Sequence, residues 1–260
     1  MPGTKIDSLL PSFPGDGAAL VQGASRGIGL GFVHQLLACK RFERVFATCR
    51  DPASAGGLAA IDDPALTVLE LDVTRPASIR EAARQVEASG VPIRLLLNVA
   101  GVLHDERQAP EKRLEDLDQE ALARSFAVNA IGPALVLEAF RPQLARRGRA
   151  VVAALSARVG SIGDNRLGGW YAYRASKAAL NQLMRTASIE LARRNRNALV
   201  VLLHPGTTDT GLSEPFQENV PTDKLFPVDR ACRQLLGLVD GLGEDDSGGF
   251  FAWDGRRIEW

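Results

Sequence analysis

The sequence has few of the residues that mark several common kinds of site. Its three cysteines, at positions 39, 49 and 232, are odd in number and scattered, which argues against a disulfide framework and fits a reducing compartment. The three histidines are equally scattered and suggest no metal site. Basic and acidic residues number 31 each, so a net charge of zero gives no sign of polyanion binding. We therefore expect neither a metal nor a nucleic-acid partner.

Inspection of the sequence also finds no apolar run long enough to suggest a membrane-spanning or leader segment. A hydrophobic fraction of 45% and a charged fraction of 24% are ordinary for a globular protein. A chain of 260 residues can bury a sizeable core within one α/β domain. We expect a soluble, cytoplasmic protein with no membrane partner.

Short apolar segments alternate with amphipathic ones along the chain. Strands without strict polar alternation, separated by helices, are typical of a parallel sheet covered on both faces. We therefore expect an α/β fold: a single-domain, Rossmann-type, doubly wound parallel sheet over residues 17–260, preceded by a flexible arm over residues 1–16, which are rich in Pro, Gly and Ser. The expected strands are 18–22, 44–49, 66–71, 93–98, 150–155, 199–204 and 249–253, and the expected helices are 29–39, 77–88, 119–143, 170–194 and 228–242.

The first expected strand runs into a glycine-rich turn at residues 23–29, Gly-Ala-Ser-Arg-Gly-Ile-Gly. Glycines allow a tight turn and let the backbone approach a pyrophosphate, while the following helix offers free N–H groups and a positive dipole. The turn stands at a strand-to-helix junction, which is the context that this mechanism requires. The sequence therefore predicts a dinucleotide-binding turn made of Gly23, Ser25, Arg26, Gly27, Ile28 and Gly29.

The end of the second expected strand bears on which dinucleotide binds. An acidic side chain at this point would bind the ribose hydroxyls of NAD, but our alignment places Cys49 there, followed by Arg50. A guanidinium suits the dianionic 2′-phosphate of NADP, and Arg26 adds a second positive charge. We therefore favour NADP(H). Asp51 leaves NAD open, because a carboxylate pointing inward here would favour the NAD ribose.

Tyr173 and Lys177 are four residues apart in the expected helix 170–194 and so lie on one face of it. A phenol titrates near pH ~10 unaided, and a nearby cation favours the phenolate. Lys177 would therefore lower the pKa of Tyr173, which could then act as a general acid or base near neutral pH. The same spacing is common on solvated helices, so the interpretation depends on the other motifs.

With the glycine turn and the Tyr–Lys pair in this order, the chain resembles the short-chain dehydrogenase/reductase family from Ala18 onward. Three further segments resemble family motifs: Leu-Asp-Val at 71–73, Asn-Val-Ala-Gly at 98–101 and His-Pro-Gly at 204–206. The resemblance implies that the cofactor also contacts Asp72, Val73, Asn98, Ala100, Gly101, Tyr173, Lys177, Pro205, Gly206, Thr208 and Thr210.

The resemblance also implies a catalytic tetrad of Asn129, Tyr173, Lys177 and a serine, in which Asn129 holds a water that links Lys177 to solvent. The family usually has Ser-Ser-x-x-Gly after the fifth strand, with the second serine acting on the substrate. In this chain Ala157 occupies that position. We prefer Ser156 as the catalytic serine and keep Ser161 in reserve, because an offset of one residue can turn a side chain to the other face. Alternatively, Ser156 only bonds nearby backbone.

Within the family, Gly-Ser-Ile at 160–162, Gly-Gly-Trp-Tyr at 168–171 and the ending at 250–255 are similar to the Sniffer/C-factor group of carbonyl reductase-like proteins. This implies an NADP(H)-dependent oxidoreductase that transfers a hydride between the nicotinamide and a ketone, aldehyde or secondary alcohol. Two alternatives stay open: a regulatory protein that binds NADP(H) with little turnover, and an NAD-linked alcohol dehydrogenase. Family members commonly associate through helices that correspond to 119–143 and 170–194, so we expect a homo-oligomer.

The motifs do not identify the substrate. We expect its pocket to be lined by residues 102–105, 158–165 and a lid-like irregular segment at 211–227. We expect His104 to be a solvated loop residue, Trp170 to pack in a core or an interface, and the charged stretch 104–118 to be a solvated surface loop.

Overall fold

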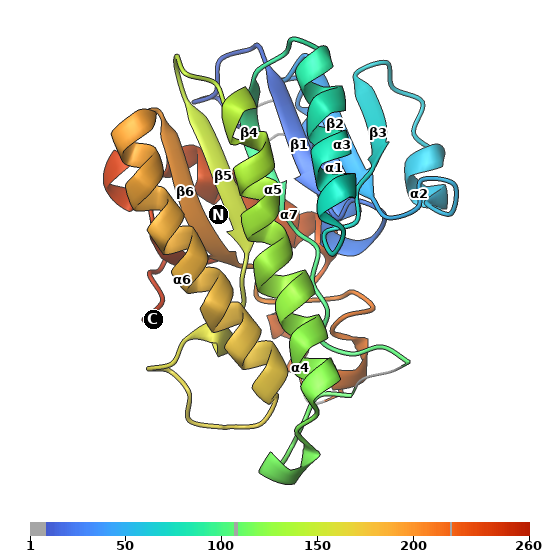
Figure 1. Ribbon diagram of the computed structural model, residues 1–260, viewed down its shortest axis with the longest axis vertical. Helices are drawn as coiled ribbons and strands as arrows, with labels where there is room; N and C mark the ends of the chain where they lie inside the picture. Colours follow the sequence, from blue (N-terminus) through green and yellow to red (C-terminus); the bar gives the residue numbers. More distant parts are fainter. Residues whose placement is uncertain (1–8, 107–108, 219) are drawn as a thin grey trace.

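Seven parallel strands form one sheet with helices on both faces in the computed structural model, which describes residues 9–106, 109–218 and 220–260 (Figure 1). The strand order is β3-β2-β1-β4-β5-β6-β9, so the chain winds outward from β1 in both directions, and the expected doubly wound fold is confirmed. The strands are β1 (Ala18–Gln22), β2 (Arg44–Cys49), β3 (Leu66–Glu70), β4 (Ile93–Asn98), β5 (Ala150–Leu155), β6 (Ala198–His204) and β9 (Phe250–Ala252).

The helices cover the sheet in two layers. On one face lie α1 (Gly27–Ala38) and α7 (Val228–Gly241). On the other lie α3 (Pro76–Ala88), α5 (Gly132–Phe140) and α6 (Tyr171–Arg194), while α4 (Gln119–Phe126) extends from α5 beyond the sheet (Figure 1). The ends of the expected elements are displaced by two residues at most, and a short helix not expected from the sequence, α2 (Gly56–Ala59), follows β2.

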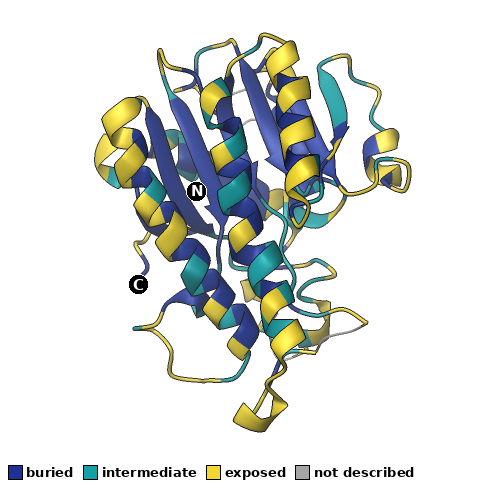
Figure 2. Ribbon diagram, in the orientation of Figure 1, coloured by how far each residue is buried: buried dark blue, intermediate teal, exposed yellow. Residues whose placement is uncertain are grey.

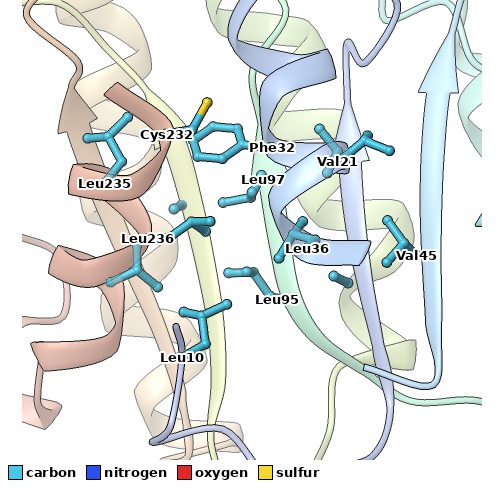
Figure 3. Close-up of a cluster of buried hydrophobic side chains, with 14 of the residues drawn as sticks. Leu10, Val21, Phe32, Leu36, Val45, Leu95, Leu97, Cys232, Leu235 and Leu236 are labelled. Carbon is cyan, nitrogen blue, oxygen red and sulfur yellow. The ribbon is translucent and has the colours of Figure 1, made fainter. Parts of the chain in front are cut away.

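Two hydrophobic clusters, one on each face, hold these layers together. Leu95 and Leu97 of β4 belong to the cluster under α1 and α7, and Leu96 belongs to the opposite cluster, so successive side chains are all buried. This explains why the strands show no polar alternation. Figure 2 shows the sheet buried between helices whose outer faces are exposed, and Figure 3 shows the first cluster.

Residues 9–16 do not form a flexible arm. Leu10 and Phe13 are buried, and the Phe13 ring packs edge-on against Phe42, with the ring centres 5.7 Å apart. The backbone N–H of Ser12 donates to the Asp240 carboxylate of α7 at 2.9 Å. The expectation was wrong for this part because a few apolar residues that cover a core edge outweigh a composition rich in turn formers. The expected arm at residues 1–8 lies outside the described residues.

The stretch Gln119–Gln143 is nearly continuous helix, but it contains a π-helical turn at Ala127–Ile131 between α4 and α5. By length and composition alone this stretch could cross a membrane, which corrects the expectation that no segment reaches that length. In the structure, Val136 and Phe140 are buried against the sheet, as in a core helix of a globular domain. π-helical turns of this kind are frequent at functional sites.

The segment after β6 is less irregular than expected. Two short strands, β7 (Thr207–Thr208) and β8 (Leu225–Phe226), pair in parallel and close the residues between them into a loop. Strands of two residues are too short to give a periodic signal. Residue 219 of this segment lies outside the described residues.

Candidate active site

The glycine turn lies at the carboxyl end of β1, against the segment that follows β4. Gly23 has φ of +85°, and a Cβ on it would lie 2.6 Å from the backbone nitrogen of Ala100. A Cβ on Gly29 would lie 2.0 Å from the carbonyl oxygen of Gly23. Both positions therefore require glycine, and the backbone of the turn is left open at the start of α1, where a phosphate group can approach.

The predicted residues converge at the carboxyl ends of the strands from distant parts of the sequence. The Cγ2 of Thr210 lies 3.3 Å from where a Cβ on Gly27 would stand. A Cβ built on Gly101 would lie 3.3 Å from Asn129 Oδ1 and 3.6 Å from Lys177 Nζ. In doubly wound folds the ligand binds outside the carboxyl ends of the strands, where their order reverses.

Two arginines, Arg50 directly after β2 and Arg26 in the glycine turn, carry positive charge at this part of the site. Arg26 and Arg50 are exposed, and their side chains have no hydrogen bond or ion pair with any residue in the described ranges. Asp51 instead bonds its own turn: Oδ1 accepts from the backbone N–H of Ala53 at 3.0 Å and of Ser54 at 3.4 Å. Hydrogen bonds from Ser54 and Ala53 lower the pKa of Asp51. Oδ1 of Asp51 is therefore held by its own turn, and the carboxylate stays ionised beside the two guanidinium groups.

A row of polar side chains crosses the same edge of the sheet. Gln22 of β1 is in register with Thr48 of β2 and Asn98 of β4, and its Oε1 accepts from the backbone N–H of Ala100 at 3.3 Å. Both polar side-chain atoms of Asn98, and Oγ1 of Thr48, are buried without a hydrogen-bond partner in the described structure. Buried polar atoms are rarely left unpaired, so this row fits a site that takes a polar ligand.

Asp72, at the end of β3, is fixed by its surroundings. Its Oδ1 accepts from the backbone N–H and the hydroxyl of Thr74, and its backbone N–H bonds Ser78 Oγ. No hydrogen bond within the described residues is made by Oδ2 of Asp72, so that oxygen can accept from a ligand.

Tyr173 and Lys177 lie side by side in the first two turns of α6 and are both buried. Lys177 Nζ lies 5.7 Å from the centre of the Tyr173 ring and donates to the carbonyl oxygen of Leu155, at the end of β5, over 2.8 Å. Burial lowers the pKa of Lys177 to about 8, which leaves it mostly protonated at pH 7.

Burial raises the pKa of Tyr173, although we expected Lys177 to lower it. The expectation was wrong for this structure because removal of the phenol from water outweighs a cation whose Nζ is bound to a backbone carbonyl. In the structure Tyr173 is therefore a neutral phenol at physiological pH, which suits it to give a proton.

The side chain of Asn129, in the π turn, is hydrogen-bonded to both the loop after β4 and helix α6. Its Oδ1 accepts from the backbone N–H of Val102, and its Nδ2 donates to the carbonyl of Val102, both at 2.8 Å. Nδ2 also donates to Ser176 Oγ of α6 at 3.0 Å. The side chain thus ties the loop after β4 to the helix that carries Tyr173.

Both candidate serines have protein partners. Ser156 is buried and its hydroxyl donates to Asn181 Oδ1 of α6 at 2.6 Å. Ser161 is also buried, and its Oγ accepts from the backbone N–H of Asp164 at 3.1 Å. Ala157, at the position where the family has its serine, is partly exposed. Contact of either serine with a substrate stays a prediction.

Three aromatic side chains whose mutual contacts the sequence did not indicate lie in a row beside Tyr173. The Trp170 ring centre lies 6.4 Å from that of Tyr173 and 4.9 Å from that of Phe216, and His104 lies edge-on to Phe216 at 5.7 Å. His104 Nε2 also lies 3.1 Å from the carbonyl oxygens of Gly211 and Leu212. His104 is thus bound to the lid segment, and Trp170 packs beside the candidate catalytic tyrosine. His104 is therefore not the solvated loop residue that we expected, because its contacts join segments far apart in the sequence, whereas the packing of Trp170 agrees with the expectation.

The chain matches a family model described as short chain dehydrogenase over residues 17–221. It is 37% identical over 169 residues to C-signal of Myxococcus xanthus, an alignment that covers 65% of this chain and 93% of C-signal.

Two solved structures share the whole architecture. The NADPH-bound carbonyl reductase from chicken fatty liver is 34% identical, with a TM-score of 0.82 and coverage of 94% of this chain and 98% of that one. Carbonyl reductase Sniffer of D. melanogaster is 28% identical, with a TM-score of 0.83 and coverage of 94% and 99%.

Proposed function

The chain belongs to the short-chain dehydrogenase family, and from this premise we propose that it is an NADP(H)-dependent oxidoreductase acting on a ketone, an aldehyde or a secondary alcohol. The observation that carries the proposal is the convergence of Tyr173, Lys177 and Asn129 beside Gly101, next to the glycine turn. A phenol and an ammonium at the carboxyl edge of a doubly wound sheet can exchange a proton with a ligand bound there.

Charge at the end of β2 supports NADP(H) over NAD. Arg26 and Arg50 have no partner among the described residues and can bind a 2′-phosphate, while Oδ1 of Asp51 is held by its own turn. The glycine turn would hold the pyrophosphate through backbone N–H groups at the start of α1, and Asp72 Oδ2 would accept from the adenine. The chicken carbonyl reductase with a similar fold is described as NADPH-bound.

When bound, NADPH supplies the hydride, and the protein supplies position and proton transfer. Tyr173 would give its proton to the oxygen of the carbonyl substrate. Because burial raises the pKa of Tyr173, the phenol form, which can give this proton, predominates near neutral pH. Lys177 places a positive charge 5.7 Å from the tyrosine ring and would stabilise the phenolate that proton transfer leaves.

Asn129 and the serines have supporting roles in this proposal. Asn129 fixes the loop after β4 against α6 and would hold the water that links Lys177 to solvent. Ser156, with Ser161 in reserve, would orient the carbonyl oxygen. The rings of Trp170 and Phe216 would form an apolar wall for the substrate beside Tyr173.

A second candidate function is an NADP(H)-binding regulatory protein of low turnover. It is favoured by Ala157 at the usual serine position, together with the engagement of Ser156 by Asn181 and of Ser161 by Asp164. The third candidate, an NAD-linked alcohol dehydrogenase, loses support because the Asp51 carboxylate bonds Ala53 and Ser54.

We also propose that the protein is a cytoplasmic homo-oligomer. A groove of about 370 Å³ runs between α5 and α6, where it is lined by Leu137, Leu183 and Met184 among others. Leu183 is 41% exposed, and Ile131, the last residue of the π turn before α5, is 49% exposed, which suits an apolar contact between copies. Molecular mass in solution, measured by light scattering, tests this proposal.

The test of the proposed function combines cofactor binding with turnover. The purified protein is titrated with NADPH and with NADH, and then supplied with NADPH and a panel of ketones and aldehydes. Preferential binding of NADPH with turnover supports the oxidoreductase. NADPH binding without turnover supports the regulatory protein, and a preference for NADH supports the alcohol dehydrogenase.

A further inference from the structure

The helix that carries Tyr173 is capped by a residue from another part of the chain. Trp170 is the N-cap residue of α6, and its side chain caps no backbone N–H. Instead, the carboxylate of Glu111 accepts from the backbone N–H of Ala172 at 3.2 Å, and the carbonyl oxygen of Glu111 accepts from the backbone N–H of Trp170 at 2.5 Å. Glu111 therefore binds the backbone on both sides of the first residue of α6.

Glu111 lies in the charged stretch that the sequence suggested was a solvated loop, and that expectation was wrong for this residue. It is only 5% exposed, while its neighbours Lys112 and Arg113 are exposed. Residues 107 and 108 of the stretch lie outside the described residues. A buried carboxylate is costly unless it is compensated, and the free N–H groups and positive dipole at the start of a helix provide that compensation.

The turn that Glu111 binds holds one residue, Trp170, in an unfavourable backbone conformation. Gly168, Gly169 and Trp170 follow one another at φ values of +64°, +66° and +52°. A tryptophan at positive φ persists only where its surroundings enforce it, and such residues cluster at active sites. The bond from the Trp170 N–H to Glu111 helps to enforce this conformation, which sets the indole between Tyr173 and Phe216.

A second observation on Glu111 indicates that the arrangement serves more than folding. Its other carboxylate oxygen, Oε1, is buried and has no hydrogen-bond partner in the described part of the chain. A serine or aspartate at position 170 would cap the helix with its own side chain, and an apolar residue could then stand at position 111. That arrangement would bury no unpaired carboxylate oxygen. The residue at position 170 is instead a tryptophan beside Tyr173, and the cap comes from Glu111.

We propose that Glu111 is a positioning residue for the reaction, an inference that rests on the proposed function. Through its bonds to Trp170 and Ala172 it fixes the first turn of α6, and with it the phenol of Tyr173 and the indole of Trp170. Within the described residues, the Glu111 carboxylate makes no hydrogen bond to Tyr173 or Lys177. Small displacements of a proton donor are enough to slow a reaction strongly.

Three variants test the inference. Glu111→Ala removes the carboxylate, and Glu111→Gln keeps an oxygen that can accept from the Ala172 N–H. Glu115→Ala is the matched control, because Glu115 is exposed on the same segment and, within the described ranges, pairs only with Arg113. For each variant we would measure kcat, KM, the NADPH dissociation constant, and amide hydrogen exchange of residues 168–177.

Glu111→Ala should lower kcat by about 10- to 100-fold through misplacement of Tyr173, with NADPH affinity unchanged. It should also speed exchange at the start of α6. Glu111→Gln should recover most of both properties, and Glu115→Ala should resemble the parent. The recovery by glutamine is a readout that loss of folding alone would not give.

The inference is overturned if Glu111→Ala keeps its kcat and its slow exchange, or if Glu111→Gln is as defective as Glu111→Ala. Either result would refute the role of Glu111 but not the proposed function, as long as the parent protein reduces a carbonyl substrate with NADPH. If the parent binds NADPH without turnover, the proposed function fails, and the exchange measurement still tests whether Glu111 fixes the first turn of α6.

Discussion

Lys177 donates from Nζ to the carbonyl oxygen of Leu155, 2.8 Å away, and so joins the helix of the candidate catalytic pair to the end of β5. The ammonium is thereby held beneath the site, 5.7 Å from the centre of the Tyr173 ring. Both groups are buried, and burial shifts their pKa values in opposite directions, each toward the neutral form.

The lowered pKa of Lys177 predicts a pH-dependent stability. Its folded-state pKa is about 8, below its ordinary value of 10.5. Between these two values the unfolded chain holds more protons at this residue than the folded one, so stability rises with pH. The free energy of unfolding of the parent relative to Lys177→Met should therefore increase by on the order of 2 kcal/mol from pH 8 to pH 10. Urea denaturation of both proteins at the two pH values measures this difference, and a constant difference would refute the assignment.

Arg50 should determine the preference between the two dinucleotides. Arg50→Asp should weaken NADPH binding by about 10- to 100-fold, which is the loss of one charge-assisted hydrogen bond, and should leave NADH binding unchanged or stronger. Fluorescence titration of the nicotinamide measures both affinities. Arg44→Asp is the control, because Arg44 stands at the opposite end of the same strand. Equal losses for NADPH and NADH would show that Arg50 does not contact the 2′-phosphate.

Phe13 should be part of the folded core. Phe13→Ala should lower the free energy of unfolding by about 3 kcal/mol or more, because a buried aromatic ring is removed. Pro11→Ala, at an exposed position two residues earlier, should change it little. A Phe13→Ala variant as stable as the parent would support the flexible arm that the composition suggested.

Variants at positions 156 and 157 can distinguish the role of Ser156 from that of a serine at position 157. Ser156→Ala should lower the free energy of unfolding by about 1 to 2 kcal/mol, because it leaves Asn181 Oδ1 buried without its donor. If Ser156 also orients the substrate, as proposed, kcat should fall. Ala157→Ser restores the family's usual serine and should raise kcat. A variant Ala157→Ser that is slower than the parent would argue against a substrate contact at position 157.

The order of strands and helices could be predicted from the sequence because apolar runs and amphipathic stretches carry periodic signals. The stretches at Ile93–Asn98 and Ala150–Leu155 are fully buried strands, as their composition suggested. The residues that meet at the glycine turn were also indicated: the four-residue spacing pointed to Tyr173 and Lys177, and the family resemblance implied Gly101, Asn129 and Thr210.

What the sequence did not reveal depends on contacts between distant segments. Phe13 packs with Phe42, His104 binds the lid through Gly211, and Glu111 caps a helix that begins sixty residues later. None of these contacts follows from local spacing. The raised pKa of Tyr173 was missed for a similar reason, since the spacing to Lys177 shows proximity but not how deeply both side chains are buried.

The most direct test of the central claim compares the parent with Tyr173→Phe for NADPH-linked reduction of a panel of ketones and aldehydes, with NADPH affinity measured in both. Tyr173→Phe should lose about 10²- to 10⁴-fold in kcat, the usual contribution of a general acid, while its NADPH affinity stays that of the parent. Equal rates of NADPH consumption in the two proteins would contradict the account.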